Sequence, residues 1–141
     1  MQDRFKFRYN FNNKIYNVYA IDLSHSKGEI VSLDGMETLM CKLDLNNLIQ
    51  CSGLKDKNGK LIYEGDIVKY FCPAEYCSDG LHKCPECYSG ENGRVHYDED
   101  LAMYEYRSES DQCPLTDNIN TEEDLELIGN IYENPELLES N

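Results

Sequence analysis

The sequence predicts a mainly β protein with a small barrel in its C-terminal half. Short runs of strand-forming residues recur at close spacing along most of its 141 residues. Turn-prone pairs such as Asn12-Asn13 and Asn58-Gly59 separate these runs, because Asn and Gly tolerate the positive φ of tight hairpins. Only the last residues carry a clear helix start. Many short strands with close turns are typical of small barrels.

The first part of the chain is expected to form a β-rich N-terminal subdomain, residues 1–50. Three strands are predicted there: residues 5–11, 15–21 and 29–33. The first alternates apolar and polar side chains, and it should pair with the second as a hairpin across Asn12-Asn13. Residues 36–50 fit neither the helical nor the strand period, so we expect irregular structure with one strand near residues 48–51.

The second part, residues 51–141, supplies about five further strands. They are residues 61–63, 67–71, 94–98, 102–107 and 125–131, with a polar loop at 112–121. A short C-terminal helix should follow, because Asn134 occupies an N-cap position, Pro135 the first helical position and Glu136 the first turn. Five short strands fit a barrel of the SH3 type, which we expect to carry a Cys-rich insertion at residues 72–93.

Two stretches of the chain resemble the YopX family of small proteins, which bacteriophages and prophages mainly encode. The stretches are GLKDKNGKLIYEGDIVKY at residues 53–70 and LELIGNIYENPELL at residues 125–138, together with the opening RFKFR at residues 4–8. The resemblance implies an SH3-like barrel in the C-terminal part and a bacterial host cell as the setting, but no particular reaction. Residues 71–93 depart from the usual family pattern, since some twenty residues intervene where the family passes quickly to the next strand.

That insertion contains four cysteines whose spacing suits a metal ion. Cys72, Cys77, Cys84 and Cys87 follow the pattern C-x4-C-x6-C-x2-C, and the C-x2-C pair can chelate one ion from a single turn. We therefore predict a structural zinc site, which would also order a loop that has no core of its own. Two alternatives stay open: His82 could replace Cys72 or Cys77 as a ligand, or the four thiols could be reduced and metal-free. The isolated Cys41, Cys51 and Cys113 read as small apolar side chains.

The net charge of −14 is concentrated at the end of the chain. Residues 98–141 contain Arg107 as their only base and carry a net charge of −13, whereas residues 1–97 carry −1. Such a field repels nucleic acids and anionic membranes, which argues against direct nucleic-acid binding. It fits a solvated surface, and it also fits an inhibitor that mimics a nucleic-acid backbone.

The function expected from these features is a non-enzymatic protein-interaction module. No local grouping of residues suggests a nucleophile with its base, so we expect no catalytic residues and no organic cofactor. No stretch approaches the roughly 20 apolar residues of a membrane span, and the N-terminus lacks a leader pattern. We expect a cytoplasmic protein that binds a host or phage protein partner; self-association also stays open. The alternative is the acidic inhibitor of a host DNA- or RNA-binding protein.

Overall fold

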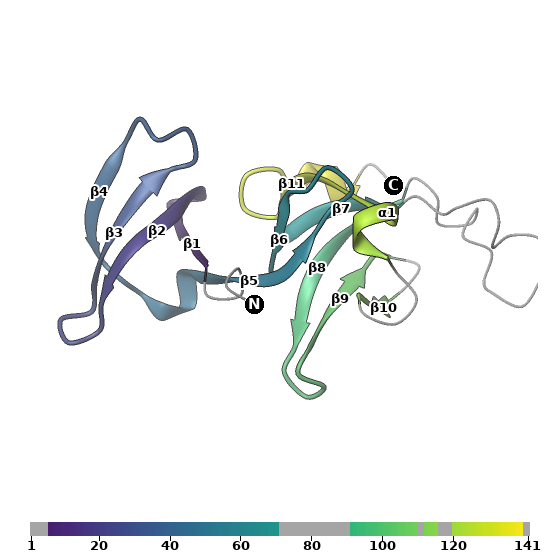
Figure 1. The fold of residues 1–141 in the computed structure, drawn as a ribbon, viewed down its shortest axis with the longest axis horizontal. Coiled ribbons are helices and arrows are strands. Elements are labelled where there is room, and N and C mark those ends of the chain that lie inside the picture. Colours follow the sequence, from purple (N-terminus) through teal and green to yellow (C-terminus); the bar gives the residue numbers. More distant parts are fainter. Residues whose placement is uncertain (1–5, 71–90, 110–111, 116–119, 140–141) are drawn as a thin grey trace, which may run out of the picture.

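Two antiparallel sheets make up a mainly β fold in the computed structural model, which describes residues 6–70, 91–109, 112–115 and 120–139. Figure 1 shows β1 to β4 on one side and β6 to β11 on the other, with β5 between them. The predicted fold class, mainly β, is therefore confirmed.

The first sheet has the strand order β4-β3-β2-β1-β5-β6. Its strands are β1 (Phe7–Phe11), β2 (Lys14–Asp22), β3 (Lys27–Ser32), β4 (Thr38–Lys42), β5 (Leu48–Lys55) and β6 (Leu61–Tyr63). The hairpin across Asn12-Asn13 is confirmed: both residues have positive φ, 50° and 61°, as a type I′ turn requires. Tyr9, Tyr16 and Ile30 are buried on one face of this sheet, where Leu43 covers them.

Strand β4 is absent from the sequence-based prediction, which treated its residues as irregular. It pairs with β3 through contacts such as Ile30 opposite Leu39. Leu39 and Cys41 pack against the core, whereas Met40 between them is 72 % exposed. Because an apolar side chain points outward here, the three residues form a continuous apolar run and hide the alternation that marks a strand.

The second sheet has the order β10-β9-β8-β7-β11. Its strands are β7 (Asp66–Tyr70), β8 (Asn92–Asp98), β9 (Met103–Arg107), β10 (Gln112–Pro114) and β11 (Leu125–Asn130). The pairing of β7 with β11, for example Val68 opposite Leu127, brings the two motif-bearing stretches of the sequence side by side. Ile62 of β6 is buried in the same core as Val68 and Leu125, so the β5–β6 hairpin packs on this sheet.

The closed barrel of the SH3 type stays a prediction. Among the described strands, β10 and β11 are the two edges of the second sheet, and the order of pairing does not join them. The predicted polar loop at 112–121 contains β10 and a one-turn helix, α1 (Thr121–Asp124). The C-terminal helix is present as α2 (Glu136–Glu139), and a 3-10 turn (Leu45–Asn47) precedes β5.

The hairpin between β5 and β6 differs in its turn from the predicted one. Gly59 has φ +78°, but Asn58 does not have positive φ, so the two-residue type I′ turn is wrong. The buried carboxylate of Asp56 is the reason. Its Oδ1 accepts hydrogen bonds from the N–H groups of Asn58 and Lys60, both at 2.9 Å, and Asp56 N–H donates to Lys60 O. These bonds favour a longer loop in which only the glycine is left-handed.

None of the helices in the described part of the chain combines the length and the apolar character that a membrane crossing requires.

Candidate interaction site at the junction of the two sheets

Side chains of the first sheet form a buried cluster that also contacts the turn after β11. Ile15 of β2, Ile49 and Cys51 of β5 and Tyr63 of β6 are at most 4 % exposed, and the ring of Tyr132 packs against them. Because β5 contributes to the first sheet and pairs with β6, this cluster fixes how the two halves of the molecule meet.

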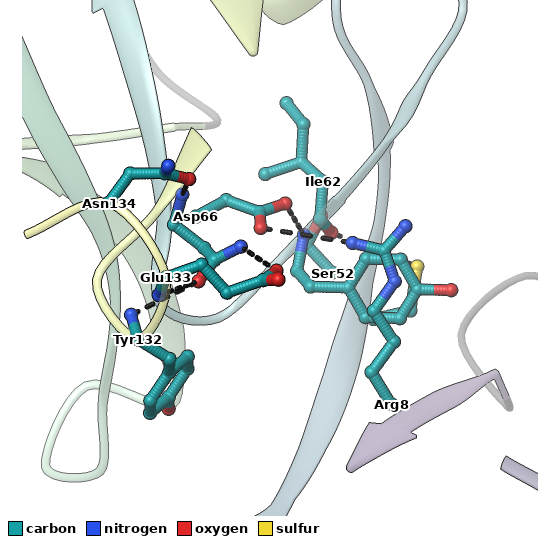
Figure 2. Close-up of polar contacts among 10 residues, drawn as sticks. Arg8, Ser52, Ile62, Asp66, Tyr132, Glu133 and Asn134 are labelled. Atoms are coloured by element: carbon teal, nitrogen blue, oxygen red, sulfur yellow. Dashed lines mark hydrogen bonds and ion pairs between the residues drawn. The ribbon is translucent and has the colours of Figure 1, made fainter. Parts of the chain in front are cut away.

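Arg8 of β1 is the charged residue of this junction. Its guanidinium carbon lies 4.0 Å from the centroid of the Tyr63 ring, which is a cation–π contact. Its Nη1 lies 3.9 Å from Oδ1 of Asp66, at the start of β7. Figure 2 shows Arg8 on one side of Asp66 and the segment of Tyr132 to Asn134 on the other. Arg8 of β1 therefore contacts the end of β6 through Tyr63 and the start of β7 through Asp66.

Asp66 is buried, and its surroundings favour the protonated carboxyl. Burial raises its pKa from 3.8 to about 7, and the Asp56 carboxylate acts in the same direction. The hydrogen bond from Tyr63 N–H to Oδ2, at 2.8 Å, and the charge of Arg8 lower the pKa but do not offset burial. The same hydrogen bond closes the turn between β6 and β7, so the carboxyl has a structural role whatever else it does.

The turn after β11 completes the junction. Ile131 N–H donates to Gly65 O at 2.8 Å, and a Cβ added to Gly65 would lie 2.9 Å from Cε2 of the Tyr132 ring. Gly65 also has φ +83°, so both its conformation and the space above it require glycine. Asn130 holds the turn, because its Oδ1 accepts from Tyr132 N–H and Glu133 N–H at 3.0 and 2.8 Å. Burial raises the pKa of Tyr132, with Glu64 and Asp66 adding to the effect and Arg94 opposing it.

An open groove of about 640 Å³ runs beside this junction. Its lining residues come from the start of β1, the second half of β2 and β6: Lys6, Phe7, Asn17, Val18, Tyr19, Ala20, Ile21, Leu61 and Tyr63. Tyr63 thus belongs to both the groove and the junction. The lining combines apolar and aromatic side chains with a nearly equal share of polar surface, and its open shape suits binding better than catalysis.

The predicted metal ligands Cys72, Cys77, Cys84 and Cys87, and the alternate ligand His82, lie outside the described residues. Within the described ranges, no group of three or more His, Cys, Asp or Glu side chains is placed to hold a metal ion. Cys51 is buried as predicted, and Cys41 and Cys113 are half-buried.

The junction and the groove are absent from the sequence-based prediction. Arg8 and Asp66 read there as a polar strand position and a turn residue, and they are far apart along the chain. Their meeting depends on β1 and β6 both flanking β5, a pairing that no local pattern indicates. The sequence contains one partial signal for the junction. Asp66 directly precedes the apolar pair Ile67-Val68, and an Asp in that position can begin a buried strand.

Comparison with known proteins identifies the family of this chain and solved structures that resemble it. A family model described as "YopX protein" matches residues 6–139 of this chain. No curated protein matches. The crystal structure of protein EF1440 from Enterococcus faecalis is similar, with 23 % sequence identity, a TM-score of 0.47 and coverage of 94 % of this chain and 96 % of that chain.

Proposed function

Because the chain belongs to the YopX family, we propose that it is a phage- or prophage-encoded interaction module that binds a protein partner in the cytoplasm of a bacterial host. The observation that carries this proposal is the open groove beside the junction, whose lining mixes apolar, aromatic and polar surface. Tyr19 on its wall is 77 % exposed, so an aromatic ring is available at the groove for contact with a partner. The second half acts in this proposal as a barrel of the SH3 type that supports one wall of the groove.

The proposed module is non-enzymatic. Carboxyl groups with a pKa of about 7 are common in catalytic sites, so Asp66 is the residue to consider as a possible general acid or base. Asp66 does not line the groove, and its Oδ2 is already engaged by Tyr63 N–H. A general acid must reach a substrate, so this geometry favours a structural carboxyl.

A second candidate function is the acidic inhibitor of a host DNA- or RNA-binding protein. It is favoured by the charge of residues 98–141, a net −13. Eight of the described acids there are exposed and therefore able to face a basic partner: Glu99, Asp100, Glu109, Glu122, Glu123, Glu133, Glu136 and Glu139. Affinity that depends on such charges falls steeply as salt rises, whereas affinity from apolar contact persists.

Capture of partners from bacterial host lysate at low and high salt tests the proposed function. A partner of the groove should be retained at both salt concentrations and lost from the variant Ala20→Glu, which places a charge on the groove wall. The control variant Met36→Glu changes a residue that is 86 % exposed and outside the groove, and it should retain the partner. A partner that is released at high salt and lost from the variant Glu99→Gln/Glu122→Gln/Glu123→Gln would instead favour the acidic inhibitor.

We also propose a structural zinc ion on Cys72, Cys77, Cys84 and Cys87, with His82 as alternate ligand. The support is the C-x2-C pair and the complete set of four soft ligands in one short segment. Elemental analysis of protein purified without a histidine tag should give about one zinc per chain. Cys84→Ser should lower that content strongly, and Cys113→Ser, outside the segment, should leave it unchanged. Zinc-free wild-type protein would show that the thiols serve another purpose.

A further inference from the structure

The sequence contains two asparagine–glycine pairs, and the fold places them in opposite surroundings. Asn58-Gly59 lies in the turn between β5 and β6, whereas Asn92-Gly93 lies at the start of β8. An asparagine that precedes glycine is prone to lose its side-chain amide, because glycine has no Cβ to hinder attack by its own main-chain nitrogen. The surroundings of each pair therefore decide whether it can react.

The fold protects Asn92. This residue is 9 % exposed, its Nδ2 donates to Leu137 O at 2.8 Å, and it pairs with Lys69 of β7. Gly93 is enclosed as well, because a Cβ added to it would overlap the ring of Tyr106. The side chain of Asn92 could turn toward the nitrogen of Gly93 only if β8 separated from its neighbours, so the pair should be stable in the folded protein.

Asn58 has the opposite surroundings. It is exposed, and no described atom lies within 4 Å of a Cβ built on Gly59, apart from those of the adjoining residues. Among the described residues, none is hydrogen-bonded to the side-chain amide of Asn58. Only the main chain is held: Asn58 N–H donates to Asp56 Oδ1, and Gly59 N–H donates to Asp56 O at 3.0 Å. Attack therefore needs a local opening of the turn, which separates exposed polar residues and leaves the core intact.

We propose that Asn58 is a site of spontaneous deamidation, at which it is converted to aspartate and isoaspartate while Asn92 stays intact. The nitrogen of Gly59 gives its proton to water and attacks Cγ of Asn58, so that a C–N bond forms. The side-chain nitrogen leaves as ammonia, and the product is a five-membered succinimide. Water then opens this ring. Opening at the side-chain carbonyl gives aspartate, and opening at the main-chain carbonyl gives isoaspartate. Water is the only co-reactant.

The conversion affects how the β5–β6 turn is attached to β11. In isoaspartate the main chain runs through the former side chain, so it is one methylene group longer between residues 58 and 59. Asp56 Oδ1 accepts from the N–H groups of Asn58 and Lys60, which lie on either side of this extension, and its Oδ2 accepts from Leu127 N–H. One oxygen can no longer serve both donors of a longer turn. Isoaspartate should therefore lower the stability of the protein.

The test incubates the folded full chain at mildly alkaline pH and follows both pairs by peptide mapping with mass spectrometry. Asn58 should be converted to aspartate and isoaspartate, and Asn92 should react at least about tenfold more slowly. In guanidinium chloride, which removes the protection of the fold, the two should react at similar rates. Equal rates in the folded protein would overturn the proposal. So would an Asn58 that stays intact while the unfolded chain is converted.

The variant Asn58→Gln is the matched control, because its longer side chain keeps an amide but closes the corresponding ring much more slowly. Incubated wild-type protein that carries isoaspartate should unfold at a lower urea concentration than fresh protein, and Asn58→Gln should show no change on incubation. The same urea midpoint for fresh and converted wild-type protein would show that the turn tolerates the longer main chain, which would overturn the effect on stability.

Discussion

Replacing Asp56 with alanine is expected to destabilise the protein by roughly 4 kcal/mol, because three partly buried backbone N–H groups lose a charged acceptor. The carboxylate is 1 % exposed. Its Oδ1 accepts from Asn58 and Lys60, and its Oδ2 accepts from Leu127 N–H at 2.9 Å. Asp56 thus holds the β5–β6 turn and attaches it to β11. Urea unfolding followed by circular dichroism measures the loss.

Two further variants separate this role from that of an ordinary turn aspartate. Asp98 also accepts from two backbone N–H groups, those of Asp100 and Leu101, but its turn is exposed. Asp98→Ala should therefore cost at most about 1 kcal/mol, since water replaces the lost acceptor. Asp56→Asn keeps one oxygen and should fall between the two. Equal losses of unfolding free energy for Asp56→Ala and Asp98→Ala would contradict the proposed role of Asp56 in attaching the β5–β6 turn to β11.

The second large effect concerns the pH dependence of stability at Asp66. Below its unfolded pKa of 3.8, the carboxyl is protonated in both the folded and the unfolded state. Between 3.8 and about 7, only the folded state keeps the proton, so the free energy of unfolding falls as pH rises through this window. Above about pH 7 the carboxyl is ionised in both states, so the free energy of unfolding no longer changes with pH through this group. At about 1.4 kcal/mol per pH unit, the total decrease in the free energy of unfolding is at most roughly 4 kcal/mol.

Asp66→Asn should remove this contribution while its side-chain oxygen still accepts from Tyr63 N–H. We expect the variant to match the wild type near pH 4 and to exceed it by up to a few kcal/mol at pH 8. The difference between the two proteins is the quantity to measure, because the pKa values of Asp22, Asp34 and Asp98 shift downward and add the opposite slope to both.

A direct titration checks the assignment. The carboxyl carbon signal of Asp66 should titrate with a midpoint near 7 under the combined influence of burial, Arg8, Asp56 and the hydrogen bond from Tyr63. A midpoint below 3.8 would show that the hydrogen bond from Tyr63 and the charge of Arg8 outweigh burial. In that case Asp66→Asn should lower stability at neutral pH instead of raising it.

The hairpins and most strands could be predicted because their signals are local. Asn12-Asn13 requires only that two adjacent residues accept positive φ, and the structure confirms it. The turn at Asn58-Gly59 was predicted in place but not in type, because the deciding contact is the side chain of Asp56, which the two-residue rule ignores. β4 was missed because the outward Met40 obscures the strand period.

The junction could not be predicted for a different reason. Arg8, Tyr63 and Asp66 meet only after β1, β5 and β6 have paired, and that order is a property of the whole sheet. The groove likewise needs residues of β1, β2 and β6, which are distant in the sequence. The strands at residues 67–71 and 125–131 were predicted because both stretches carry dense local signals, and the structure pairs them as β7 and β11.

The shared strand β5 has a consequence for how the molecule loses its structure. Gln50 pairs with Phe7 in one half, and Cys51 pairs with Tyr63 in the other. A chain cut after Gln50 would therefore end inside a strand and expose Ile49 and Cys51, which are 4 % and 1 % exposed in the intact protein. Neither half can melt without removing a neighbour from the other, so the protein should unfold in a single cooperative transition.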